Sequence, residues 1–149
     1  MRALRTIALA AFLFAVSAPN GIAAPNDDAS NRMIEAVNSI RADHGLRPLR
    51  PAPKLAHSSN GYAKHLIRTD SFGHGSSFQN AGFRTAGEIL AYNSGWSAKP
   101  RPAIRMWLGS SSHRALMLSS RFRYAGAGLA RGRFGRSMAT MWVVHFGAH

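Results

Sequence analysis

The chain has 149 residues, 19 Lys and Arg against 6 Asp and Glu, a net charge of +13, and no cysteine. The absence of cysteine excludes disulfides and thiol nucleophiles, and the positive charge predicts attraction to anionic surfaces such as a cell envelope. Because the arginines are scattered and not interleaved with aromatic side chains, no specific nucleic-acid site is expected.

Residues 1–24 have the three parts of a secretory signal peptide. Arg2 and Arg5 form its basic start, an apolar run follows, and small residues lead to a cleavage site after Ala23 or Ala24. The apolar run is shorter than the roughly 20 residues that span a bilayer, so we expect removal rather than retention as a membrane anchor. The sequence therefore predicts a secreted or periplasmic protein.

The remainder is long enough for one domain and too short for two. We expect a flexible leader at residues 25–30, a single domain at residues 31–149, and a monomer. The first helix should begin at Ser30 or Asn31, where a side chain can cap it, and end near Gly45. Its apolar face at helical spacing consists of Met33, Ile34, Val37 and Ile40.

A second helix is predicted over residues 53–69. Its buried stripe should be Leu55, Ser59, Tyr62, Ala63 and Leu66. An irregular segment pinned by Phe78 and Phe83 should follow up to Gly87.

Pro102 fits the first turn of a third helix. We expect Ala103, Met106 and Trp107 to face inward there. A short helix should restart near His113 after a serine N-cap, with Ala115, Leu116 and Leu118 as its packing residues.

Residues 124–147 change to the alternating pattern of β-strands. Two extended runs flank a glycine-rich turn at residues 132–135, which predicts a β-hairpin. In the final run, Trp142, Val144 and Phe146 should lie on one face and Met141 and Val143 on the other, so both faces should be covered. Helices followed by a strand pair predict an α+β fold with the sheet between helices.

Three polar side chains stand where elements are expected to meet. His74 lies in "DSFGHGS", Glu88 in "AGEILA" and His113 in "WLGSSSHRALML". The glycines beside His74 would leave room for an approaching ligand, and two neutral imidazoles with a nearby carboxylate suit a divalent metal. Taken singly, the same residues also fit a polar turn, a surface acid and a helix-start histidine. The chain contains none of the common hydrolase, zinc-protease or phosphate-loop motifs.

The order of short motifs resembles the CAP superfamily, also called the SCP or pathogenesis-related-1 type domain, in a short cysteine-free bacterial form. The matching pieces are "AVNSIRADHGLRPL", "FGH" at 72–74, "AGE" at 86–88, "MWLGSSSHR" at 106–114, "AGAG" at 125–128 and "MWVVHFG" at 141–147. The resemblance implies an α-β-α sandwich with a small antiparallel sheet. It also implies a cleft that contains His74, Glu88 and His113. In some relatives the histidines bind Zn²⁺ or another divalent ion, and other relatives hold sterols or lipids in separate grooves.

The chain departs from the family pattern at three positions. Ser110 stands where many larger relatives carry a second acid, Ile89 follows Glu88 in place of asparagine, and Tyr62 replaces a histidine of the second helix. Glu88 is then the single candidate for a catalytic acid or base, which weakens a hydrolytic interpretation.

We expect a secreted binding domain, not an enzyme. Its cleft, formed by His74, Glu88, Ser110 and His113, should hold a divalent cation or a small ligand, with the two histidines as metal ligands. The first alternative is a metal-assisted hydrolase of peptide or cell-wall material with Glu88 as base. The second is a cationic module that docks on the anionic envelope.

Overall fold

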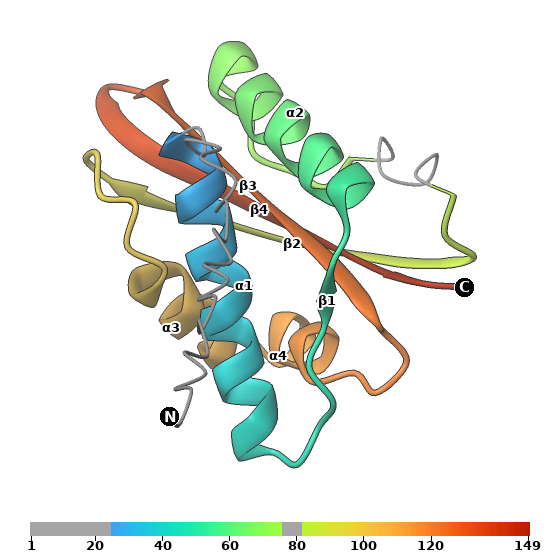
Figure 1. Cartoon of the computed structure of the whole chain (residues 1–149). Helices are drawn as coiled ribbons and strands as arrows, with labels where there is room; N and C mark the ends of the chain where they lie inside the picture. The colour runs from blue at the N-terminus through green and yellow to red at the C-terminus, as the bar shows by residue number, and fades with distance from the viewer. Residues whose placement is uncertain (1–24, 76–81) are drawn as a thin grey trace, which may run out of the picture.

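The computed structural model describes residues 25–75 and 82–149, so the predicted signal peptide and Phe78 lie outside the described residues. The described residues form four helices and four strands, whose arrangement can be followed in Figure 1. In chain order they are α1 (Pro25–Asp43), β1 (Arg50–Pro51), α2 (Pro53–Thr69), β2 (Thr85–Ser94), α3 (Arg101–Gly109), α4 (Ser111–Met117), β3 (Tyr124–Phe134) and β4 (Ser137–Ala148). No helix in these two described ranges is both long and apolar enough to span a membrane.

Helix α1 begins earlier than predicted. It starts at Pro25 rather than at Ser30 or Asn31, so the residues expected to form a flexible leader are helical. Proline is tolerated there because the first helical residues need no intrahelical N–H bond, and Asp28 pairs with Arg32 one turn later. The predicted end is confirmed, since Gly45 follows the helix with a φ of 67°.

The four strands form one mixed sheet in the order β1-β3-β4-β2. The short β1 runs parallel to β3, and β4 pairs antiparallel with both β3 and β2. The predicted hairpin is confirmed, but its turn is shorter than expected. Gly132 pairs with Ala139 inside the ladder, and only Gly135 and Arg136 connect the strands. Gly135 has a φ of 59°, which glycine adopts at little steric cost.

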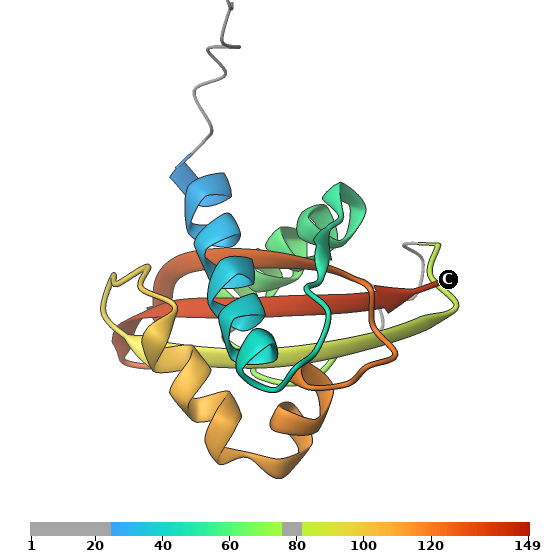
Figure 2. The same ribbon diagram turned by 60° about the horizontal axis from the view of Figure 1, so that its bottom comes forward.

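Helices cover both faces of the sheet, as Figure 2 shows. Helices α1, α3 and α4 pack on one face over a core that includes Trp107, Trp142 and Phe146. Helix α2 packs on the other face over a smaller core that includes Leu66 and Met141. The two predicted faces of β4 are confirmed, because its alternate residues enter the two different cores.

Strand β2 was not predicted. The irregular segment expected to reach Gly87 becomes a strand at Thr85, which pairs with β4 along its whole length. Two inward predictions for the helices are also wrong. Met106 is 49% exposed because the buried stripe of α3 runs through Ala103, Ile104 and Trp107. Ala115 is exposed, and Met117 takes the buried position in the two-turn helix α4.

Two glycines of β3 allow α2 to lie directly on the sheet. A Cβ atom at Gly126 would come 2.0 Å from the backbone nitrogen of Ala56, and one at Gly128 would come 2.2 Å from that of Asn60. The close approach is fixed by hydrogen bonds. Ser59 Oγ donates to the Gly126 carbonyl at 2.8 Å, and the Leu129 N–H donates to Asn60 Oδ1 at 3.1 Å. The predicted bounds of α2 are confirmed.

Candidate functional site

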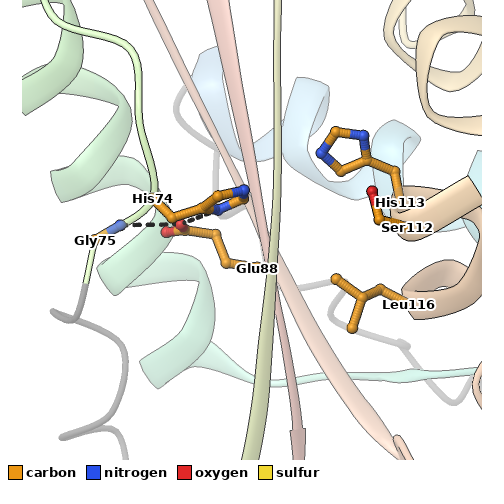
Figure 3. A pocket seen from close by; sticks show the side chains of 6 residues that line it. All are labelled: His74, Gly75, Glu88, Ser112, His113 and Leu116. Carbon is orange, nitrogen blue, oxygen red and sulfur yellow. Dashed lines mark hydrogen bonds and ion pairs between the residues drawn. The ribbon is translucent and has the colours of Figure 1, made fainter. Parts of the chain in front are cut away.

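Glu88 is a buried carboxylate on the edge strand β2, only 5% exposed. Because a carboxylate only accepts hydrogen bonds, its three neighbours must be donors. Its Oε1 accepts from His74 Nδ1 at 2.8 Å and from the Gly75 backbone N–H at 3.1 Å, and its Oε2 accepts from His145 Nε2 at 2.9 Å. Figure 3 shows Glu88 reaching from its strand to His74 and Gly75.

The segment that carries His74 is held by hydrogen bonds at Asp70 and at Gly73. Helix α2 ends at Thr69, and Asp70 caps it in the left-handed conformation with a φ of 49°. Asp70 Oδ1 accepts from the Gly135 N–H at 2.5 Å, which ties the segment to the hairpin turn. The hydroxyl of Tyr62, on α2, donates to the Gly73 carbonyl at 2.6 Å. These bonds bring His74 to β2.

The two glycines beside His74 differ in what they allow. A Cβ atom at Gly75 would lie 2.6 Å from the Tyr62 ring, so no larger residue fits there without displacing that ring. A Cβ atom at Gly73 would meet nothing within 4 Å. Only Gly75 is therefore required by close packing.

His113 approaches the same place from the other side of the sheet. It is the third residue of α4, which packs on the face opposite α2, and Figure 3 shows its imidazole across β2 from the Glu88 carboxylate. The ring centroids of His74 and His113 are 6.3 Å apart. Burial, and to a lesser extent the charge of His74, lowers the pKa of His113 below its usual value. His113 is therefore a neutral imidazole at neutral pH.

These side chains line a cavity of about 210 Å³. Its walls are His74, Gly75, Glu88, Ser112, His113 and Leu116. The structure thus brings together three of the four predicted cleft residues. Ser110 is the exception, because it lies in the turn before α4 and does not line this cavity. Its hydroxyl is 3.1 Å from that of Ser112, which does.

Sequence reasoning missed His145 and misplaced Glu88. Glu88 is not at a junction between elements but is the fourth residue of β2, directly opposite His145 in the β2–β4 ladder. His145 is fully buried on the face of β4 that also carries Met141 and Val143. A polar residue at an apolar position of a buried strand was the signal that could have identified it.

The two imidazoles determine which ligands the cavity can bind. His74 Nδ1 keeps its hydrogen and donates it in the hydrogen bond to Glu88. When the ring is neutral, its Nε2 therefore has a free lone pair. Two neutral imidazoles can bind a transition metal or hydrogen-bond a small polar ligand. Within residues 25–75 and 82–149, no group of three or more His, Asp or Glu side chains is arranged to hold a metal ion.

Comparisons with known proteins agree with this fold. The chain is 26% identical over 121 residues to the "Uncharacterized membrane protein YlbC" of Bacillus subtilis, an alignment that covers 74% of this chain and 34% of that protein. An extracellular protein containing an SCP domain from Bacillus anthracis superposes with a TM-score of 0.66 at 23% identity, over 83% of this chain and 41% of that one. The chain thus spans less than half the length of either protein.

An outer surface protein from Borrelia burgdorferi has a similar size. It superposes with a TM-score of 0.66 at 20% identity, over 82% of this chain and 93% of that one. At these identities the two superpositions show a shared fold.

The family assignment rests on the sequence match. Residues 34–146 match the family described as "CAP: Cysteine-rich secretory protein family", a range that runs from α1 to β4 and includes the whole candidate site. The chain therefore belongs to the CAP family, as a form without cysteine.

Proposed function

We propose that the cavity at the edge of β2 holds a divalent cation or a small polar ligand between His74 and His113. The observation that carries this proposal is the pair of imidazoles whose centroids lie 6.3 Å apart, one of them oriented by a buried carboxylate. Carboxylates that fix the tautomer and ring orientation of a histidine are common behind metal sites.

The surroundings of Glu88 favour an orienting role over a catalytic one. Its two oxygens accept three hydrogen bonds, from His74, Gly75 and His145, and the side chain is buried. A general base must reach the proton that it removes, directly or through one water. Glu88 is already engaged on both oxygens, so binding without catalysis is the function that the geometry supports better than hydrolysis.

A zinc ion would take its protein ligands from His74 and His113, with water or the bound ligand in the remaining positions. With two imidazoles as its ligands, the ion would polarise a bound oxygen and exchange its other ligands readily. The volume of about 210 Å³ sets the size of a ligand. It is below the roughly 300–1,000 Å³ of pockets for drug-sized molecules, so the cavity suits an ion with its waters or a small polar molecule.

We also propose that the protein works outside the cytoplasm. This proposal is supported by the signal-like character of residues 1–24 and by the descriptions of two structural neighbours as extracellular and outer-surface proteins. Cleavage would be tested by mass spectrometry of the exported protein. A mature chain that begins at Ala24 or Pro25 would support the proposal, and an intact N-terminus in the cytoplasm would contradict it.

Isothermal calorimetry with zinc chloride tests the metal proposal. The wild type should bind one ion, and the His74→Ala, His113→Ala double variant should lose that binding. The matched control is His57→Ala, which removes an exposed histidine of α2 outside the cavity and should bind like the wild type. Unchanged zinc heats in the double variant would exclude these histidines as ligands.

A further inference from the structure

Three arginines line a second cavity, at the sheet edge opposite the first. It has a volume of about 310 Å³ and is lined by Arg47, Pro48, Arg50, Arg123 and Tyr124. It lies where β1 borders β3, and the histidine cavity lies along β2. β1 and β2 form the two opposite edges of the sheet (Figure 1). Of the residues in the two described ranges, none lines both cavities.

The backbone fixes the spacing of these arginines. Arg50 and Tyr124 are partners in the parallel β1–β3 pair, and the Arg50 N–H donates to the Arg123 carbonyl at 2.8 Å. The loop that carries Arg47 is held from behind, because Arg41 Nε donates to the Arg47 carbonyl at 3.1 Å. The sheet and this loop therefore fix the backbone positions from which the three arginines line one cavity.

A fourth cation strengthens the positive charge around the cavity. Arg41 is fully buried on α1 and donates to the carbonyls of Met117 and Ser119 at 2.7 and 3.0 Å. Burial lowers the pKa of Arg41, and the charge of Arg123 lowers it further by a smaller amount. Among the residues that the structure describes, no Asp or Glu lines the cavity. Like charges held together without a counter-charge repel one another, and a bound anion would remove that cost.

We propose that the cavity formed by Arg47, Arg50, Arg123 and Tyr124 is a binding site for a phosphate group. Guanidinium groups match the geometry of phosphate oxygens and can bind them in a bidentate manner. Three arginines carry more charge than a single carboxylate could neutralise, which favours a doubly charged phosphate. The cavity volume of about 310 Å³ leaves room for a group attached to the phosphate.

Calorimetry with inorganic phosphate, in a phosphate-free buffer at physiological chloride concentration, tests this site. The Arg47→Gln, Arg50→Gln variant should bind phosphate at least roughly tenfold more weakly than the wild type, because two charged donors are lost. The matched control is Arg101→Gln, Arg105→Gln, which removes two exposed arginines of α3 and leaves the same net charge. The control should keep wild-type affinity.

Two results would overturn the proposal: no phosphate binding by the wild type, or equal weakening in both double variants. Arg47 and Arg50 are exposed, so their replacement should leave the fold intact, which circular dichroism checks. Arg123→Gln is a poorer first variant, because Arg123 Nη1 also donates to the Ser120 carbonyl at 2.7 Å.

Vesicles identify the source of the phosphate. The test uses vesicles of phosphatidylcholine with phosphatidic acid. If the wild type binds these vesicles, the Arg47→Gln, Arg50→Gln variant does not, and inorganic phosphate displaces the wild type from them, the ligand is a lipid headgroup. If those vesicles bind both double variants equally while inorganic phosphate still discriminates between them, the ligand is a free phosphate compound. Either result retains the arginine site.

Discussion

Glu88 joins two histidines that the chain supplies from different elements. His74 follows α2 and His145 belongs to β4, yet both donate to the same buried carboxylate, one to each oxygen. A buried charge is tolerated only where its hydrogen bonds are satisfied. His145 therefore acts on the cavity through Glu88: it holds the carboxylate in the position from which Glu88 orients His74.

Replacement of His145 by leucine should lower the free energy of unfolding by about 3 kcal/mol, because Glu88 Oε2 would lose its buried donor. The Glu88→Leu, His145→Leu double variant should lose less than the sum of the two single variants, since no unpaired charge remains. Urea unfolding monitored by tryptophan fluorescence measures both. A single variant as stable as the wild type would show that the His145–Glu88 bond contributes nothing to folding.

His113 gives the site a dependence on pH. Because its pKa is lowered in the folded protein, the unfolded chain binds a proton at this residue more readily. The contribution of His113 to stability is therefore complete above its ordinary value of about 6.5 and is lost as the pH falls below that value. NMR titration of the ring, with a chelator present, should give a midpoint below the ordinary one.

The His74→Gln variant separates the two causes of this shift. Burial would remain and the charge of His74 would be absent, so the midpoint of His113 should move upward only in part. A His113 midpoint that is the same in His74→Gln and in the wild type would contradict a contribution from His74, and a wild-type midpoint at or above the ordinary value would contradict the effect of burial.

Among the elements, α2 and β3 depend on contact between their backbones. Gly126→Ala or Gly128→Ala should lower the free energy of unfolding by about 3 kcal/mol, because the new Cβ would collide with backbone atoms that cannot move aside singly. Gly61→Ala is the control, on helix α2, which packs against these two strand glycines. Its Cβ would meet nothing within 4 Å, and alanine in a helix interior should add about 0.5–1 kcal/mol.

Thermal unfolding of the three alanine variants measures these changes. A destabilisation at Gly61 equal to that at Gly126 would mean that the close approach of α2 to β3 is not what requires glycine. A loss of stability in the Gly126 and Gly128 variants alone would support the requirement for glycine where α2 approaches β3. Since α2 also positions Tyr62 and the His74 segment, the two β3 variants should weaken zinc binding as well.

The elements that could be predicted from sequence are those with a repeated apolar pattern. The stripe on α2 and the alternation in β4 each continue for several residues, so one substitution does not hide them. Strand β2 has no such pattern, because Glu88 faces inward where an apolar residue would be expected. The two-residue β1 is too short to show any period, and its existence depends on pairing with β3.

Three residues of the site could be predicted from sequence, but not the contacts between them. His74, Glu88 and His113 stood out because polar residues with glycine or serine neighbours are unusual between apolar elements. Their convergence around β2 depends on pairing between residues far apart in the chain, such as Glu88 with His145, and only the family resemblance indicated it from sequence. The helical start at Pro25 was missed because proline and asparagine are also typical of linkers.

At the scale of the whole molecule, the domain is held by packing while its charges oppose it. Two apolar cores lie on either side of one sheet, and the chain has no disulfide to limit unfolding. Positive charges exceed negative charges by 13, and a net charge this far from zero repels itself in the folded state. Within the described ranges, Arg32 with Asp28 is the sole ion pair between a Lys or Arg and an acid.

This imbalance predicts that salt stabilises the protein. Surface ion pairs weaken as the Debye length falls to about 10 Å at 0.1 M salt, whereas the repulsion between like charges is relieved. The melting temperature should therefore rise between low and physiological sodium chloride, by about 4 °C if screening returns ~1 kcal/mol. The measurement belongs in a phosphate-free buffer, so that binding at the arginine cavity does not add to it. If the melting temperature instead falls as sodium chloride is added, attraction between ion pairs contributes more to stability than repulsion between positive charges costs. That result would contradict the prediction from the distribution of charges.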